Sequence, residues 1–316
     1  MLLCVAAEGT CFRNKEVLPM SLVINHNMMA MNAARNLNAS YSNLATSTRR
    51  LSSGLRVGTA ADDAAGLAIR ELMRADIASL YQGVRNANDA ISMIQTADGA
   101  LQVIDEKLIR MKELATQAST GTYNSDQRLI IDSEYQAMAS EITRIANATD
   151  FNGIHLLNGS LAGTDPNTQT NILHNGNGLV STGPIKIHFG TGNDCAEDYY
   201  YISINNATAS AMGLGNSHIS TQSAAQRALA AIQNAIISKD KIRANLGSMQ
   251  NRLENTITNL SIQAENLQAA ESRISDVDVA TEMTEFVRQQ ILSQAAVAML
   301  AQANSLPQMA MQLIGG

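Results

Sequence analysis

The chain has 316 residues, a formal net charge of -6, 45% hydrophobic residues, 3% aromatic residues and no Trp. Its apolar content is Ala, Leu, Ile and Met, which suits the seams of packed helices better than a wide globular core. Scattered basic residues and the lack of any apolar run near the roughly 20 residues of a membrane span give no reason to expect nucleic acid or a membrane as a partner.

Residues 1–19 show no helical period, no basic region before their short apolar start and no secretory cleavage pattern. Periodicity begins abruptly after Met20. Lys15-Glu16-Val17 is also what a purine-rich ribosome-binding site gives when it is translated in frame. We therefore expect translation to start at Met20 and residues 1–19 to be a non-native extension, and the mass of the mature amino terminus tests this expectation.

Residues 21–51 carry a strict seven-residue apolar series that predicts a long amphipathic helix. The series is Val23, Ala30, Leu37, Leu44 and Leu51. Gly54 predicts a left-handed end to this helix. The stretch from Ser21 to Ala61 has no acidic residue, so its basic side chains are expected to pair with carboxylates elsewhere in the assembly. The basic residues are Arg35, Arg49, Arg50 and Arg56, and the candidate partners are Asp276, Asp278, Glu282 and Glu285.

The next helix is predicted from about Asp63 to about Ser119. Thr59-Ala60-Ala61-Asp62 fits a capping box, and Asp62 and Asp63 suit the positive end of a helix. The alternative, a catalytic pair of carboxylates, is disfavoured because adjacent carboxylates at a helix start are usually caps. An apolar series in steps of three and four runs from Ile77 to Ala118 with one extra three-step, and it predicts a partner along the whole helix.

Another helix is predicted from Ser125 to about residue 148. Two Asn-Gly pairs, Asn152-Gly153 and Asn158-Gly159, then bracket four residues and indicate a hairpin. Residues 161–219 are rich in Gly, Asn, Thr and Asp, and alternating patterns predict strands at 185–189 and 200–204. This segment is expected to be a short, variable, β-rich insertion.

Helix is predicted again from near Thr221, with a break at Ser275-Asp276 and a last helix from about Val279 to Asn304 that Pro307 limits. The first of these two helices carries a second seven-residue series, which predicts a seam for partner helices over roughly 40 Å. The series is Leu246, Leu253, Leu260, Leu267 and Ile274.

These patterns predict a mainly α fold: a long antiparallel helical coiled-coil bundle formed by the N- and C-terminal arms, with a β-hairpin and a short β-rich central insertion. Signatures of enzymes are missing, because the five His residues show no metal-ligand spacing and no phosphate-binding Gly loop or nucleophile elbow is present. Fifteen Met residues suit interfaces. We therefore expect no catalytic residues, no metal and no cofactor.

Several segments together resemble one family, bacterial flagellin, in its order along the chain. They are Met20–Asn27 (MSLVINHN), Arg50–Arg56 (RLSSGLR), Asp62–Ile69 (DDAAGLAI), Phe151–Gly153 (FNG), Glu271–Asp276 (ESRISD), Leu300–Asn304 (LAQAN) and Leu306–Gln308 (LPQ). The resemblance covers residues 20–160 and about 220–314. It implies a subunit of the extracellular flagellar filament, exported by the flagellar type III apparatus with an export chaperone and polymerised under a cap protein.

The resemblance also implies how the arms are used. Residues 21–60 with 277–316 are expected to form an inner terminal-helix domain that orders on assembly, and 64–160 with 220–275 a helical core domain with the β-hairpin. The expected self-assembly seams are Leu37, Leu44, Leu51, Leu253, Leu260, Leu267 and Ile274. A hook-filament junction protein of the same family is the alternative. A signalling coiled coil and a flagellin with a protease insertion are disfavoured, since the sequence lacks a membrane span and an HExxH motif.

Flagellins are further recognised by Toll-like receptor 5 through the outer face of the long helix. The matching positions here are residues 108–117 with Glu134 from the antiparallel helix, and Arg110, Leu114 and Glu134 fit the recognised pattern. Lys112 stands where Arg is common, which is expected to weaken a bidentate contact. The alternative is that Leu114 and its neighbours serve packing.

Overall fold

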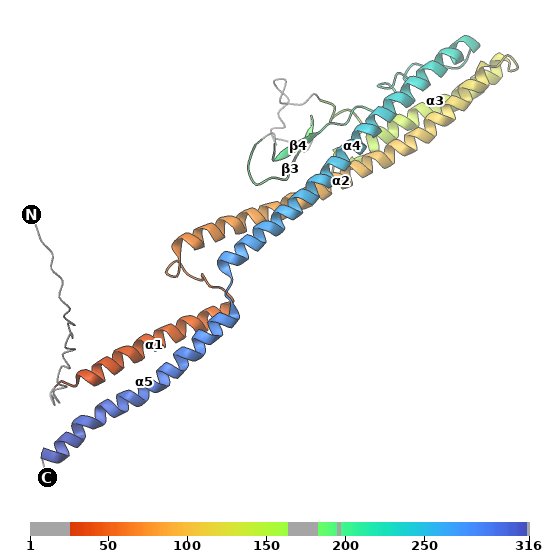
Figure 1. Cartoon of the computed structure of the whole chain (residues 1–316). Helices are drawn as coiled ribbons and strands as arrows, with labels where there is room; N and C mark the ends of the chain where they lie inside the picture. Colours follow the sequence, from red (N-terminus) through yellow and green to blue (C-terminus); the bar gives the residue numbers. More distant parts are fainter. Residues whose placement is uncertain (1–25, 164–182, 195–196, 315–316) are drawn as a thin grey trace, which may run out of the picture. The chain divides into compact units, whose positions relative to one another are not determined.

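The computed structural model describes residues 26–163, 183–194 and 197–314 (Figure 1). The chain divides into two compact units, one from the described parts of Met1–Leu67 and Ile274–Gly316 and one from Ala68–Arg273. The expected extension at residues 1–19 and the first seam position, Val23, lie outside the described residues.

The first unit is a pair of helices, α1 (Met28–Ser53) and α5 (Val279–Ile314), which run side by side (Figure 1). The Oδ1 atom of Asn27 accepts the Ala30 N–H at 3.0 Å and caps the start of α1. Gly54 closes the helix in the left-handed conformation, with φ of 74°, as its position in the sequence predicts.

The second unit is built on three helices, α2 (Ala64–Ser119), α3 (Ser125–Ala148) and α4 (Gln222–Ser275). At 1.5 Å per residue, the 56-residue α2 is roughly 84 Å long. The predicted three-four series of α2 is buried along most of its length and contacts buried residues of the other two helices. Core members are Leu101, Ile104, Leu108 and Met111 of α2, Tyr135 and Ile142 of α3, and Ile232, Leu246 and Leu253 of α4.

Two small antiparallel sheets complete the described part of this unit. The first joins β1 (Asp150–Phe151) to β2 (Ile154–His155) through Asn152 and Gly153, both at positive φ, as the predicted hairpin requires. The second pairs β3 (Ile185–His188) with β4 (Tyr199–Ile202). Long packed helices with small two-stranded sheets confirm the predicted fold class.

The start of α2 differs from the predicted capping box. The helix begins at Ala64, and Asp63 caps it by accepting the N–H groups of Ala65 and Gly66 at 3.1 and 3.0 Å. Asp62 instead accepts both the N–H and the hydroxyl of Thr59, at 3.1 and 2.8 Å, within the preceding turn. Thr59 and Asp62 therefore stabilise the turn before α2, while Asp63 caps the helix.

The end of the last helix also differs, because α5 continues through Pro307 to Ile314. Proline lacks the N–H that would bond to the carbonyl four residues earlier, here that of Ala303. That carbonyl accepts a hydrogen bond from Asn27 Nδ2 at 2.7 Å instead. A side chain from the paired helix thus satisfies the acceptor that the proline leaves without its helical partner, so the helix does not have to end there.

Candidate assembly and recognition surfaces

The contact between α1 and α5 buries small and polar side chains rather than large apolar ones. The buried residues are Ser47 of α1 and Gln289, Ser293 and Ala303 of α5. Of the predicted seam residues on α1, Leu37, Leu44 and Leu51 are only half-buried. Small residues allow close approach of two helices, but they remove little apolar surface from water.

Large apolar residues are left exposed on both helices of this pair. The exposed residues are Met28, Met29, Met31 and Tyr41 of α1, and Val279, Met283, Val287, Ile291, Leu292, Val297, Met299, Met309 and Met311 of α5. Ile291 is 60% exposed. A helix with apolar residues around its whole circumference is suited to burial among several neighbours, and one partner covers only one side. The pair thus presents an unfinished apolar surface.

Hydrogen bonds join the segment that follows α1 to the segment that precedes α5. Gly54 O accepts the Val277 N–H at 3.0 Å, and Arg56 N–H donates to Ser275 O at 2.6 Å. Arg50 lies 3.6 Å from Glu282, one of the pairings expected from the sequence. Asp62, also in this region, has a pKa below its usual range because of hydrogen bonds from Thr59, helped by nearby arginines.

The α2–α4 seam contains charged groups among its apolar residues. Leu253 and Leu260 are buried, while Leu267 and Ile274 are half-buried. Lys239 donates from Nζ to Asp105 Oδ1 at 2.5 Å, although its side chain is 3% exposed. Burial opposes the charge of this ammonium, but the Asp105 and Asp240 carboxylates outweigh that effect and raise its pKa. Arg243 and Asp98 form a second bridge at 2.7 Å.

Two of the predicted receptor-recognition residues meet on the outer face of α2 and α3. Arg110 donates from Nη2 and Nε to Glu134 Oε1 at 2.7 and 2.9 Å, and from Nη1 to Glu113 at 3.1 Å. Hydrogen bonds to Glu134 and Glu113 raise the pKa of Arg110. Leu114 is 2% exposed and belongs to the core, so it lies behind this charged face. Lys112 donates to Gln233 at 2.9 Å.

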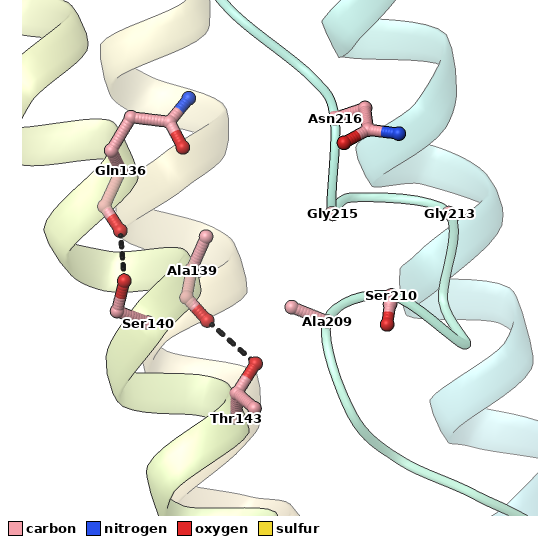
Figure 2. Close-up of a pocket in the computed structure, with 9 residues that line it drawn as sticks. All are labelled: Gln136, Ala139, Ser140, Thr143, Ala209, Ser210, Gly213, Gly215 and Asn216. Carbon is pink, nitrogen blue, oxygen red and sulfur yellow. Dashed lines mark hydrogen bonds between the residues drawn. The ribbon is translucent and has the colours of Figure 1, made fainter.

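A groove of about 520 Å³ lies between α3 and the loop at residues 209–216 (Figure 2). Its lining consists of small and uncharged residues. Two of its hydroxyls are already bonded to their own helix, since Ser140 donates to Gln136 O at 3.0 Å and Thr143 to Ala139 O at 3.1 Å (Figure 2). The residues that line the groove include no charged side chain.

Within the described residues, no group of three or more His, Cys, Asp or Glu side chains is placed to hold a metal ion. In the same part of the chain, no helix is both long enough and apolar enough to cross a membrane.

Long packed helices and an uncovered apolar terminal pair define a self-associating structural subunit. Comparison with protein families identifies the family to which this subunit belongs. Residues 24–162 match the bacterial flagellin N-terminal helical region, and residues 229–314 match the bacterial flagellin C-terminal helical region. The chain belongs to the bacterial flagellin family and is a non-enzymatic subunit of the extracellular flagellar filament that serves motility.

Relatives support this assignment over nearly the whole chain. The chain is 42% identical to a flagellin of Halalkalibacterium halodurans over 293 residues, covering 93% of this chain and all of the relative. It is also 42% identical to a flagellin of Bacillus subtilis over 305 residues, covering 92% and 99% of the two chains. The structure of a putative flagellar hook-associated protein from Vibrio parahaemolyticus shares the fold, with a TM-score of 0.51, 14% identity and coverage of 68% and 100%.

Proposed function

We propose that the exposed apolar faces of α1 and α5 are the surfaces that sister subunits cover in the filament. In this arrangement residues 21–60 with 277–316 form the inner layer, and 64–160 with 220–275 form the surrounding layer. The observation that carries the proposal is the burial pattern of the pair, where small and polar residues are buried and large aliphatic residues remain in water. In a polymer, neighbouring subunits would cover these aliphatic residues and remove them from water.

The energetic argument rests on the number of exposed aliphatic residues. Burying one Leu, Ile, Val or Met side chain contributes about 1.5–3 kcal/mol. A single such contact does not offset the lost freedom of association, which is about 4–15 kcal/mol, but several acting together do. Residues such as Ile291 and Val297 of α5 are therefore expected to act cumulatively with the half-buried seam residues.

Elongation of filament seeds by purified full chain tests the proposal. Ile291→Ser together with Val297→Ser is expected to abolish elongation while the circular dichroism of the free subunit stays close to that of the parent. Gln290→Ser is the matched control, because Gln290 is also exposed on α5 but its side chain ends in a polar amide. Normal elongation by the double variant would contradict the proposal.

We further propose that the free subunit is recognised by Toll-like receptor 5 at the outer face of α2 and α3. Arg110 and Glu134 supply the accessible charged contacts of this face, and their mutual bond fixes the guanidinium in position. Leu114 contributes from beneath, because its packing in the core holds that part of α2 in place. The proposal rests on the match of these residues to the pattern known in the family.

A receptor reporter assay on monomeric protein tests this role. Arg110→Ala and Glu134→Ala are each expected to reduce signalling, by roughly tenfold for a contact of about 1.4 kcal/mol. Arg144→Ala is the control, since Arg144 is also an exposed arginine, on α3, in a bridge to Glu141. Unchanged signalling by Arg110→Ala rejects the assignment.

Export by the flagellar type III apparatus, an export chaperone and a cap protein are proposed on the same family pattern. A second candidate role, a hook-filament junction protein, is favoured only by the shared fold with the hook-associated protein. The two roles differ in their product, because a filament subunit adds repeatedly to a seed whereas a junction protein adds a limited number of copies. Electron microscopy of seeded growth distinguishes them.

A further inference from the structure

The methionines of the described residues differ in exposure between the two units. Among the described residues, all of the large exposed methionines lie on α1 or α5. They are Met28, Met29 and Met31 of α1, and Met283, Met299, Met309 and Met311 of α5. In the other unit Met93, Met111 and Met212 are buried, and Met73, Met138 and Met249 are half-buried. Water and small oxidants thus reach the thioethers of the terminal pair much more readily than those of the core.

Six of these residues gather at one end of the helix pair. Asn27 Nδ2 donates to Ala303 O at 2.7 Å, which places the start of α1 against this part of α5. With a rise of about 1.5 Å per residue, three methionines lie within about 6 Å of Asn27 along α1 and three lie within about 12 Å of Ala303 along α5. We call the set Met28, Met29, Met31, Met299, Met309 and Met311 the methionine cluster.

We propose that the methionine cluster makes filament growth sensitive to peroxide: oxidation of these thioethers on the free subunit blocks its addition to the filament, and assembly shields them. A lone pair of the sulfur attacks one oxygen of hydrogen peroxide, the O–O bond breaks and an S–O bond forms. Proton transfer then releases one water. The sulfur is oxidised by two electrons, the peroxide is reduced, and the product is a sulfoxide.

The consequence for assembly follows from the polarity of the product. A thioether is a flexible apolar group that fills irregular gaps at interfaces. A sulfoxide carries a strong hydrogen-bond acceptor, which is costly to desolvate without a donor. The inference rests on the proposed role of α1 and α5 in polymerisation, because the penalty arises only if neighbouring subunits cover the cluster.

The first experiment treats the purified full chain with hydrogen peroxide, removes the oxidant and measures elongation of untreated seeds. The parent is expected to lose elongation by about tenfold or more, since lost burial of even one such side chain has that effect. A variant with Leu at all six cluster positions keeps apolar volume but cannot be oxidised there, and it is expected to elongate equally well before and after treatment. Leu at Met93, Met111 and Met212 is the matched control and is expected to leave the parent's sensitivity unchanged.

A second measurement needs no variant. Partly oxidised parent is polymerised, and the sulfoxide content of each methionine is compared by mass spectrometry between the filament pellet and the unincorporated subunits. Cluster sulfoxides are expected to be several-fold depleted from the pellet. Equal sulfoxide content in the two fractions, or undiminished elongation by fully oxidised parent, overturns the inference.

The Ile291→Ser and Val297→Ser variant separates the two proposals. If that double variant elongates normally, the assembly role of α5 fails whatever oxidation does. If the double variant does not elongate while the oxidised parent does, only the inference about the methionine cluster falls. Reduction of the treated protein by methionine sulfoxide reductases A and B together, one for each sulfoxide epimer, is expected to restore elongation.

Discussion

Asn27 makes hydrogen bonds to both helices of the terminal pair, one through the oxygen of its side-chain amide and one through the nitrogen. Its oxygen caps α1, and its nitrogen satisfies the Ala303 carbonyl that Pro307 leaves without a helical donor. The sequence reveals the proline but not the compensating donor, which lies 276 positions away. Proline as a helix terminator is a local rule, and a distant side chain overrides it here.

Substitution at Asn27 separates the two contributions. Asn27→Ser keeps a capping oxygen but has no amide group, so it is expected to destabilise the helix pair by about 1 kcal/mol through the unsatisfied carbonyl. Asn27→Ala also removes the cap, for a further loss of about 1 kcal/mol. Hydrogen exchange of α1 and α5 in the free subunit measures both losses. Equal exchange in the two variants would show that the cap contributes nothing, and exchange in Asn27→Ser equal to that of the parent would show that the amide donor contributes nothing.

Two carboxylates of the terminal unit give it a defined dependence on acid. Hydrogen bonds from Thr59 lower the pKa of Asp62, and hydrogen bonds from Thr281 and Ala280 lower that of Asp278. A carboxylate with a lowered pKa in the folded state contributes stability above its ordinary pKa of about 3.9, and loses it as the pH falls further through the folded value. The terminal unit is thus expected to weaken in acid.

The test compares the parent with Asp62→Asn plus Asp278→Asn between about pH 5 and about pH 3. The amide oxygen of asparagine keeps one of the two acceptor positions of each carboxylate and does not titrate, so the double variant is expected to lose less helical stability over that interval. Hydrogen exchange of α5 at each pH gives the measurement. An identical pH dependence in the parent and the double variant would show that groups other than Asp62 and Asp278 cause the acid sensitivity.

At the scale of elements, Gly83 fixes how the β3–β4 hairpin meets α2. A Cβ atom at this position would overlap the backbone of Phe189, which directly follows β3. Asn86 Nδ2 also donates to His188 O at 2.8 Å. Phe189 is buried in a small cluster with Leu80 and Leu260. The glycine is therefore required for a close approach of backbone to helix, not for a positive φ.

Alanine substitutions within α2 are expected to have opposite signs at two positions. Gly99→Ala, at an exposed site with open space, should stabilise the helix by about 1 kcal/mol. Gly83→Ala should destabilise the unit by about 1–3 kcal/mol, because the overlap with Phe189 forces the hairpin to move. Urea unfolding followed by circular dichroism checks both values. Stabilisation by Gly83→Ala would show that the hairpin does not pack tightly on α2.

The sequence predicts elements well where the apolar period is continuous. The three-four series of α2 and the break at Ser275 both lie where expected, because local packing geometry decides them. The buried Lys239 was missed, although it stands in step with Ile232, Ala235, Ile242 and Leu246 and so occupies a seam position. A charged residue at a seam position of a helix indicates a buried ion pair, and this pattern is visible in the sequence. The distant partners Asp105 and Phe189 could not be found, since no local rule pairs them with Lys239 and Gly83.

For the whole molecule, the contrast between the two units has a thermodynamic meaning. The unit of α2, α3 and α4 buries many Leu, Ile and Met side chains, whereas the α1–α5 pair buries Ser47, Gln289, Ser293 and Ala303. Since stability follows mainly from buried apolar area, the terminal pair is the weaker unit in the free subunit. Export of an unfolded chain and ordering upon assembly are both compatible with such a gradient.

Hydrogen exchange on the free subunit and on the filament provides the test at this scale. In the free subunit the amides of α1 and α5 are expected to exchange through local opening, far faster than those around Leu101–Leu108 of α2, which require the whole unit to open. In the filament, neighbouring subunits bury the exposed faces, so protection of α1 and α5 should rise by several orders of magnitude while the core of α2 changes little. Equal protection of both units in the free subunit would mean that the pair is stable without neighbours. The uncovered apolar surface would then not be the driving force for polymerisation.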